Sequence, residues 1–351
     1  MKTFLNPFLL AITLIAFTTL PACSQSTESP SVEESHEYEV TRDIEWAQPG
    51  GHSLTLDIYV PKTGKASYPV LVIFHGGGWL INDKSPMTSM SEYIAKNSEY
   101  VVCNVNYRLL VDGGNTIHMN QIIEDAMGAV LWVKDHIAAY KGDPAKLIIT
   151  GDSAGGHLAS MVVLCGNQLE SDGFTGNSLG FNPTYLPPGK TAEAVAAGNG
   201  LEVQAAILSY AAYDIYASCL GGFETAGNFF WSFSGATPRG IFGDGINVQA
   251  NPEYYKAVSP VYNIPSATER SLPPQLCTVG SADNLVTPAS VQDFVAKLRE
   301  KGHTAEYWEH QGRPHAYLDG GRNEFLGTEF EKDAPPALDK MIEFMDQVFA
   351  E

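Results

Sequence analysis

Basic residues are scarce in this sequence. Lys and Arg together number 21 against 40 Asp and Glu, which gives a formal net charge of −19 and an isoelectric point near 4.8. Nucleic acids and anionic membrane surfaces attract positive charge, so a chain this acidic argues against either of them as a partner. A neutral small molecule is more compatible, as a substrate, with a surface of this charge.

Cysteine is also rare, with five among 351 residues, and neither a Cys-x-x-Cys pair nor Cys and His at metal-ligand spacing occurs. A structural zinc site is therefore not expected, and no other metal or cofactor is indicated. Cys103 and Cys277 lie in apolar runs, where a small buried side chain is expected. Cys165 and Cys219 could pair in an oxidising compartment, but their spacing alone does not decide it.

The N-terminal segment has the pattern of an export signal. An apolar run at residues 8–20 follows the single early charge of Lys2 and has the length of a signal-peptide core, too short for a membrane span. The "LPAC" that follows resembles a bacterial lipoprotein box with Cys23 as the lipidated residue; an ordinary signal-peptidase cut is the alternative. We predict a signal peptide at residues 1–22 and a flexible Ser/Glu-rich tether at 23–40. The protein is then exported and held at the outer membrane or cell surface by a lipid anchor only, or is otherwise periplasmic or secreted.

From residue 41 to the C-terminus the chain alternates short apolar runs with amphipathic segments. Strands are predicted at residues 54–60, 69–74, 100–105, 146–150, 205–210 and 275–279. Helices are predicted near residues 122–137, 291–298 and 338–349. This alternation indicates one α/β domain with a mainly parallel central sheet and helices on both faces. Two Gly- and Pro-rich stretches, near 166–200 and 213–265, exceed ordinary connections and are predicted to be functional insertions that form a cap or loops.

Residues 151–155 read Gly-Asp-Ser-Ala-Gly, a G-x-S-x-G pattern between a predicted strand and a helical run. A sharp strand-to-helix turn raises its serine above the sheet edge and needs glycines where side chains would collide. Ser153 is therefore the predicted nucleophile.

A serine hydroxyl needs a base to activate it and an acid to orient that base, and with this turn the chain order is serine, acid, histidine. His315, in a loop after a predicted strand, is the predicted base, with His310 at the end of that strand as the alternative. His303 is expected in a solvated turn. Asp283 follows a predicted strand at the edge that carries Ser153, and it is the predicted acid.

Three consecutive glycines occur in "HGGGW", residues 75–79, directly after an apolar strand. A bare backbone can aim N–H groups at the negative charge that develops on an ester carbonyl oxygen. The amides of Gly77, Gly78 and Ala154 are the predicted oxyanion donors. His75 is expected to anchor the loop by hydrogen bonding rather than to act as a base.

Aromatic residues near these motifs could line a substrate pocket. The predicted pocket residues are Trp79, Tyr210 and Tyr213, with Phe229, Phe230 and Trp231 as further candidates. Two polar residues in the same region, His157 and Asp125, are expected to have structural roles.

The stretches "HGGGW", "GDSAGG", "GSADNLV" and "RPHAY" resemble, in this order, the hormone-sensitive-lipase-like branch of the α/β hydrolases, from about residue 43 onward. The opening "LTLDIYVP" and the tryptophan after the glycines look most like bacterial feruloyl- and acetyl-esterase-like enzymes. The resemblance implies an α/β-hydrolase fold with Ser153, Asp283 and His315 as nucleophile, acid and base, and no cofactor. It further implies a serine carboxylesterase that hydrolyses short-chain acyl or aryl esters, acetyl or feruloyl, on small molecules or carbohydrates.

Two other functions remain open at this point. The same serine, acid and histidine can cleave amides, so an aryl formamidase or a peptidase is an alternative. A surface binding protein that kept the fold and lost the chemistry is another, although such a protein would usually have lost Ser153, His315 or the glycine loop.

Overall fold

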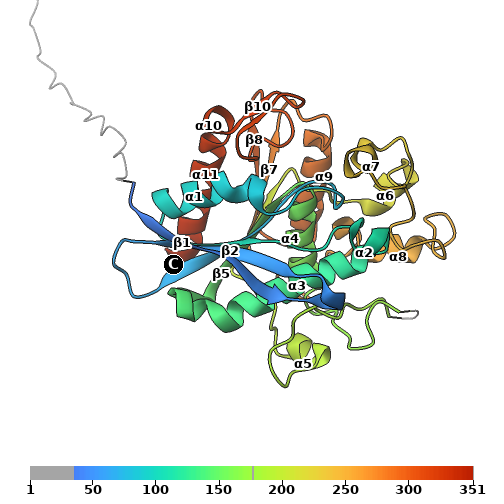
Figure 1. Cartoon of the computed structure of the whole chain (residues 1–351), viewed down its shortest axis with the longest axis horizontal. Coiled ribbons are helices and arrows are strands. Elements are labelled where there is room, and N and C mark those ends of the chain that lie inside the picture. Colours follow the sequence, from blue (N-terminus) through green and yellow to red (C-terminus); the bar gives the residue numbers. More distant parts are fainter. Residues whose placement is uncertain (1–34, 176–177, 351) are drawn as a thin grey trace, which may run out of the picture. The chain divides into compact units, whose positions relative to one another are not determined.

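An eight-stranded sheet organises the described part of the chain, which is residues 35–175 and 178–350 of a computed structural model (Figure 1). The spatial order of its strands is β1 (Tyr38–Ala47), β2 (Leu54–Pro61), β4 (Val101–Val105), β3 (Tyr68–Phe74), β5 (Gly142–Asp152), β6 (Ala205–Ser209), β7 (Gln275–Gly280) and β8 (Ala305–His310). Strand β2 is antiparallel to both β1 and β4, and all the other pairs are parallel. The predicted mainly parallel sheet is thus confirmed.

The strands that were predicted from apolar runs are covered on both faces. Every residue of β4, β6 and β7 is buried, which explains why these strands show no polar alternation. Strand β1 lacks such a run because most of its residues are exposed or half-buried, and it was not predicted. It begins at Tyr38, so the last three residues assigned to the tether belong to the sheet.

Five longer helices cover the sheet. They are α1 (Thr88–Asn97), α3 (Met119–His136), α4 (Ala154–Cys165), α9 (Pro288–Glu300) and α11 (Pro335–Phe349). Figure 1 shows α1 and α11 on one side of the sheet and α3 on the other. The predicted helices coincide with α3, α9 and α11, and α1 was not predicted.

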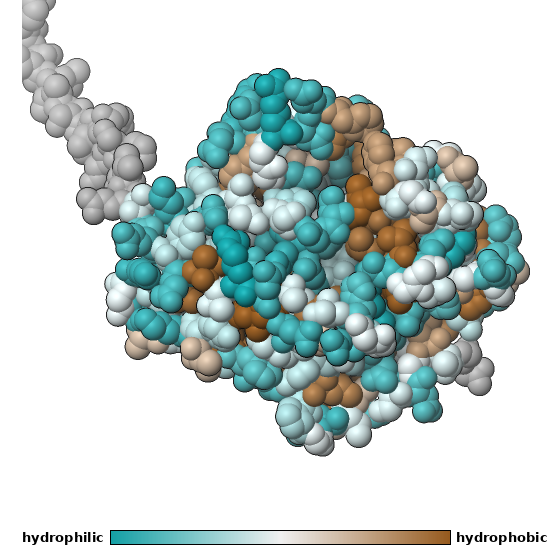
Figure 2. All heavy atoms as spheres, in the orientation of Figure 1, coloured by the Kyte–Doolittle hydropathy of each residue, from teal (hydrophilic) through white to brown (hydrophobic). Residues whose placement is uncertain are grey.

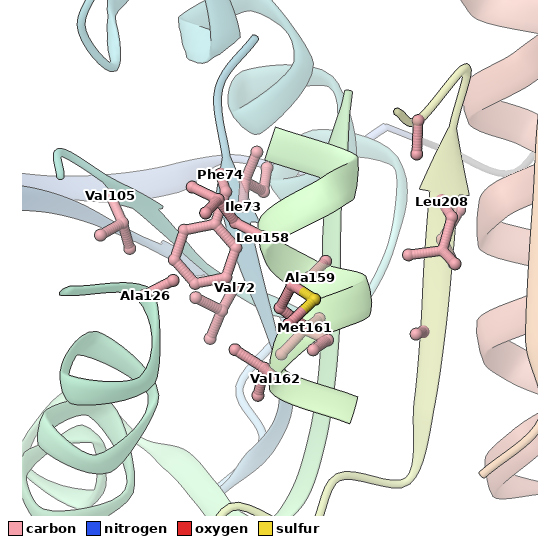
Figure 3. Close-up of a cluster of buried hydrophobic side chains, with 14 of the residues drawn as sticks. Val72, Ile73, Phe74, Val105, Ala126, Leu158, Ala159, Met161, Val162 and Leu208 are labelled. Carbon is pink, nitrogen blue, oxygen red and sulfur yellow. The ribbon is translucent and has the colours of Figure 1, made fainter. Parts of the chain in front are cut away.

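Helix α4 is buried along its whole length, since it packs on β3, β5 and β6 on one side and on α3 on the other. Figure 3 shows its apolar side chains, among them Leu158 and Val162, beside Phe74 of β3. This packing fixes the position of the N-terminus of α4, which begins directly after Ser153.

The two predicted insertions contain short helices joined by irregular segments. The first contains α5 (Ala192–Ala197), and the second contains α6 (Ile215–Leu220), α7 (Phe229–Ser234) and α8 (Pro252–Ala257). The N-terminal residues of α5, α6 and α7 are capped by the side chains of Thr191, Asp214 and Asn228. Four further short elements in the described ranges are α2 (Asp112–Asn115), β9 (Arg322–Asn323), β10 (Thr328–Glu329) and α10 (Phe330–Asp333).

The four cysteines within the described residues are buried free thiols, so Cys165 and Cys219 form no disulfide in this structure. The predicted signal peptide and Cys23 lie outside the described residues. Within the described ranges, no helix combines the length and apolar character needed to cross a membrane.

Candidate active site

Ser153 lies in the turn between β5 and α4, with φ 51° and ψ −114°, a backbone conformation that L-residues rarely adopt. The glycines on either side allow this turn because neither position has room for a side chain. A Cβ on Gly155 would lie 1.9 Å from the carbonyl oxygen of Phe74, and a Cβ on Gly151 would lie 2.3 Å from the carbonyl carbon of Gly155. The sharp turn predicted from the G-x-S-x-G pattern is therefore present.

The structure brings together the three residues that the sequence singled out. His315 Nε2 lies 2.9 Å from Ser153 Oγ, and His315 Nδ1 lies 2.7 Å from Asp283 Oδ2. All three side chains are buried. A carboxylate can only accept, so Nδ1 carries the proton and Nε2 is free to accept one from the serine hydroxyl.

Three further contacts hold Asp283 and His315 in position. The other carboxylate oxygen of Asp283, Oδ1, accepts hydrogen bonds from the amides of Leu285 and Val286, both at 2.9 Å. The ring of Tyr210 packs edge-on against the imidazole of His315, with the centroids 4.7 Å apart. Tyr210 is fully buried at this contact and does not line either of the cavities described below, where a pocket role had been predicted.

The glycine loop has a backbone that side chains would not permit. Gly77 has φ 116° and Gly78 has φ 60°, and a Cβ on Gly77 would lie 2.3 Å from the carbonyl oxygen of Ile81. The amides of Leu80 and Ile81 both donate to the Gly77 carbonyl at 3.1 Å, which closes the loop. The amides of Gly77 and Gly78 donate to no acceptor within the part of the chain that the structure describes, so they can serve a ligand beside Ser153.

His75 anchors the start of this loop, as expected. Its Nδ1 donates to the carbonyl of Gly76 at 2.7 Å, and its ring stacks on Tyr107 with the centroids 4.3 Å apart. Burial lowers the pKa of His75 to about 4, so the ring stays neutral.

His157 ties the loop to two other parts of the molecule. The indole Nε1 of Trp79 donates to His157 Nδ1 at 3.2 Å, and His157 Nε2 donates to the carbonyl of Val258 at 2.8 Å. Burial lowers the pKa of His157 to about 4, which keeps the neutral form that can donate and accept at once. The glycine loop, helix α4 and the second insertion are thereby connected through one side chain.

Two cavities open on either side of Ser153. The first, of about 330 Å³, is lined by Gly78, Ala154 and largely apolar side chains that include Trp79, Tyr213, Phe223 and Val286. The second, of about 140 Å³, is lined by Gly77, His315, Asp152, Asp319 and a group of phenylalanines. Ser153, Phe230 and Leu285 line both cavities.

The two carboxyl groups of the second cavity were not assigned to the site from the sequence. Burial raises the pKa of Asp152 well above its usual value, and the charge of Asp319 raises it further. Burial also raises the pKa of Asp319 to about 6, although the nearby His315 acts in the opposite direction. Burial thus disfavours the charged form of both carboxyl groups, and the repulsion between them disfavours their simultaneous ionisation. The only sequence signal for Asp319 is its position four residues after His315.

The other histidines have structural partners. His310 Nε2 donates to the carbonyl of Asp333 at 2.8 Å, so the alternative base is occupied elsewhere. The expectation that His303 is solvated was wrong, because it is buried and donates to the carbonyl of Pro265 at 2.8 Å. Asp125 forms the expected structural contact, an ion pair with Arg108 at 2.6 Å.

The aromatic candidates divide between the cavities and the core. Trp79 and Tyr213 line the first cavity, Phe229 lines the second, and Phe230 lines both. Trp231 is buried and donates to the carbonyl of Phe223 at 2.9 Å. Among the described residues, no group of three or more His, Cys, Asp or Glu side chains is placed to hold a metal ion.

A serine held at a strand-to-helix turn above a mainly parallel sheet, with an aspartate and a histidine on later strand-end loops, defines an α/β hydrolase. Comparison with known families narrows this class. The chain matches the BD-FAE family model over residues 56–298 and belongs to that family.

Individual relatives agree with this assignment. The esterase LipQ of Mycobacterium tuberculosis is 30% identical over 283 residues, which is 79% of this chain and 57% of the relative. The chain thus spans little more than half the length of LipQ. Among solved structures, the apo form of esterase 2 from Thermogutta terrifontis has a TM-score of 0.62 at 22% identity and covers 91% of this chain and 97% of its own. Its butyrate-bound form has a TM-score of 0.59 at 22% identity and covers 91% and 96%. These two structures share the fold of this chain.

Proposed function

We propose that this protein is a serine carboxylesterase that works through an acyl-serine intermediate. The observation that carries the proposal is the hydrogen-bond chain from Ser153 Oγ through His315 to Asp283, beside main-chain amides that have room for an anion. The relative LipQ is likewise named an esterase.

The geometry supports the following steps. His315 Nε2 takes the proton from Ser153 Oγ as the oxygen attacks the ester carbonyl carbon, and Asp283 stabilises the imidazolium that forms. The carbonyl oxygen becomes negative and accepts hydrogen bonds from the amides of Gly77, Gly78 and Ala154. The C–O bond to the alcohol then breaks, and the alcohol oxygen takes the proton from Nε2. Water repeats the sequence on the acyl-serine and releases the acid.

Short acyl or aryl esters are the proposed substrates. The first cavity, at about 330 Å³, has the size of a small-ligand pocket and not of a long trough, and its walls are mainly aromatic and small apolar side chains. The fold neighbour from Thermogutta terrifontis has been solved with butyrate bound. Acetyl and feruloyl groups, including those carried by carbohydrates, fall within this proposal.

Export by the N-terminal segment, with lipid on Cys23 as the membrane anchor, completes the proposal. Fractionation of a bacterial host that expresses the full chain tests it. The wild type should partition with membranes, and Cys23→Ala should not. Equal recovery of both in the soluble fraction would leave a plain periplasmic or secreted esterase.

A fluorophosphonate probe tests the chemistry directly, because it modifies only an activated serine. Mass spectrometry should place the adduct on Ser153, and hydrolysis of p-nitrophenyl acetate should stop at the same rate as labelling. A panel of acetyl, butyryl, hexadecanoyl, feruloyl and formyl-aryl substrates then separates an esterase from a formamidase. Absence of labelling and of all hydrolysis would overturn the proposal and favour a binding protein.

A further inference from the structure

The two cavities beside Ser153 differ in whether His315 forms part of the wall. His315 lines only the second cavity, whereas Gly78 and Ala154 line only the first. In ester cleavage the departing alcohol oxygen must receive a proton from Nε2 of the base, so the alcohol half lies on the histidine side. If the protein is an esterase as proposed above, the first cavity holds the acyl group and the second holds the alcohol.

The second cavity combines a polar floor with an aromatic rim. Asp319 lines it together with Asp152, and two amide side chains, Asn82 and Asn323, lie in the same wall. No described residue donates a hydrogen bond to the carboxylate of Asp319. Asp319 is half-buried in the wall of the cavity, where a bound molecule can donate a hydrogen bond to its carboxyl group.

The rim is an exposed cluster of phenylalanine rings. Phe233 is 58% exposed and Phe325 is 73% exposed, and their rings lie 5.9 Å apart in an edge-on arrangement. Figure 2 shows apolar surface between the regions of β10 and α7; Phe233 belongs to α7, and Phe325 lies in the segment between β9 and β10. The rim can cover the carbon skeleton of an alcohol while its polar groups face inward.

The small size of the second cavity limits what can reach Asp319. A volume of about 140 Å³ is the space of about five water molecules, so every group in its wall is within a few atoms of Ser153. A hydroxyl on the second carbon from the ester oxygen is the nearest second hydroxyl that a stable alcohol carries, so it is the shortest group that can test this contact.

We propose that Asp319 is a specificity-determining residue that accepts a hydrogen bond from a second hydroxyl on the alcohol half of the ester. The protein then prefers esters of alcohols that carry such a hydroxyl over esters of plain alkyl alcohols of equal size. Asp152 is buried whereas Asp319 is only half-buried, so Asp319 is the more accessible of the two carboxyl groups.

Two acetate esters of equal size test this proposal. 2-Hydroxyethyl acetate and propyl acetate differ only by a hydroxyl in place of a methyl group, so the ratio of their kcat/KM values isolates the hydroxyl. We expect Asp319→Leu to lower this ratio by about tenfold, because a hydrogen bond to a charged acceptor is lost. The isosteric Asp319→Asn keeps a hydrogen-bond acceptor without the charge, so it should give a kcat/KM ratio between those of the wild type and Asp319→Leu. This variant also tests the proposal if Asp319→Leu does not fold.

Two controls fix the interpretation. Asp293 is exposed on α9, away from both cavities, so Asp293→Leu should leave the ratio at the wild-type value. Exchange of the acetyl group for butyryl should leave the effect of Asp319→Leu unchanged, because the acyl group occupies the other cavity.

Three outcomes are distinguishable. Unchanged kcat/KM values for both esters in Asp319→Leu overturn the proposal. An equal fall with both esters also overturns it, because Asp319 would then act on His315 or on the fold. Failure of the wild type to hydrolyse even p-nitrophenyl acetate would instead overturn the proposed esterase function.

Discussion

The turn around Ser153 and the insertion of residues 213–265 build the same site in different ways. The turn is packed so closely that its glycines have no room for a methyl group, and it lies between a fully buried helix and a central strand. The insertion supplies Tyr213, Phe223 and Phe230 to the cavity walls from short helices and irregular segments. The nucleophile thus rests on the packed core, and these cavity-shaping groups rest on loops and short helices, where residues can change at little cost to the core.

The strongest test of the turn is removal of its hydroxyl. Ser153→Ala should lower kcat for p-nitrophenyl acetate by at least about 1,000-fold, because no covalent intermediate can form. The fold should persist, since Oγ forms its one recorded hydrogen bond with His315. Steady-state kinetics and thermal unfolding check both statements. Retention of more than about a tenth of the activity would show that another residue is the nucleophile.

A Gly→Ala substitution should lower the free energy of unfolding much more in the turn than in the insertion. Gly155→Ala should lower the free energy of unfolding by about 3 kcal/mol, because the new Cβ would meet the carbonyl of Phe74 at 1.9 Å and force α4 away from β3. Gly245 in the insertion is the matched control, since a Cβ there meets nothing within 4 Å. Gly245→Ala should change the stability by no more than about 0.5 kcal/mol. Equal losses in denaturant titrations would contradict the contrast between the regions.

Gly78 and Phe230 lie where the two regions meet. A Cβ on Gly78 would lie 2.9 Å from the ring of Phe230, so Gly78→Ala should displace the loop amides and lower kcat/KM by about 10- to 100-fold. Phe230→Ala alone should cost only a few-fold and mainly alter substrate preference.

A double-mutant cycle sharpens this prediction. In Gly78→Ala with Phe230→Ala the clash is gone, and part of the activity should return, although φ 60° still strains an alanine. Strictly additive losses in kcat/KM would mean that the ring does not hold the loop.

The smallest effect concerns the other insertion. Glu124 of α3 accepts a hydrogen bond from the amide of Asn182 at 3.3 Å, and burial raises the pKa of Glu124 to about 7 from an ordinary value of 4.5. The folded protein therefore holds a proton that the unfolded chain has released, so this group lowers stability as the pH rises from about 4.5 to about 7.

Glu124→Gln removes this titration and keeps an acceptor for Asn182. Urea unfolding should show a gain of about 1–3 kcal/mol over the wild type at pH 8 and almost none at pH 4.5. A gain of the same size at both pH values would contradict the ionisation argument.

Much of the sheet and the Ser153–His315–Asp283 contact could be predicted because each depends on local pattern. The buried strands are recognisable in the sequence as apolar runs, and the turn needs glycines at fixed positions around Ser153. Chain order then leaves few candidates for the acid and the base. Strand β1 was not predicted because its sequence is mostly polar, and α1 was not predicted because nothing in its sequence was distinctive.

The cavity walls could not be predicted because they depend on distant packing. Tyr210 and Tyr213 are three residues apart, yet one lies under His315 and the other lines the first cavity. The role of Asp319 depends on a neighbour, Asp152, that is 167 positions away in the chain and whose burial only the fold reveals. His303 was misplaced for the same reason, since its partner is the main-chain carbonyl of Pro265.

The bond from His157 to Val258 has a consequence for how this site can diversify. Its acceptor is a main-chain carbonyl, which every amino acid possesses, so the identity of the residue at position 258 does not matter to the bond. The side chains of the second insertion are therefore free to vary with the substrate while the backbone continues to hold His157, and through it Trp79, in place. New specificities can arise by substitution at positions of this segment that, unlike Phe230, do not touch the glycine loop, because the bond to His157 is kept.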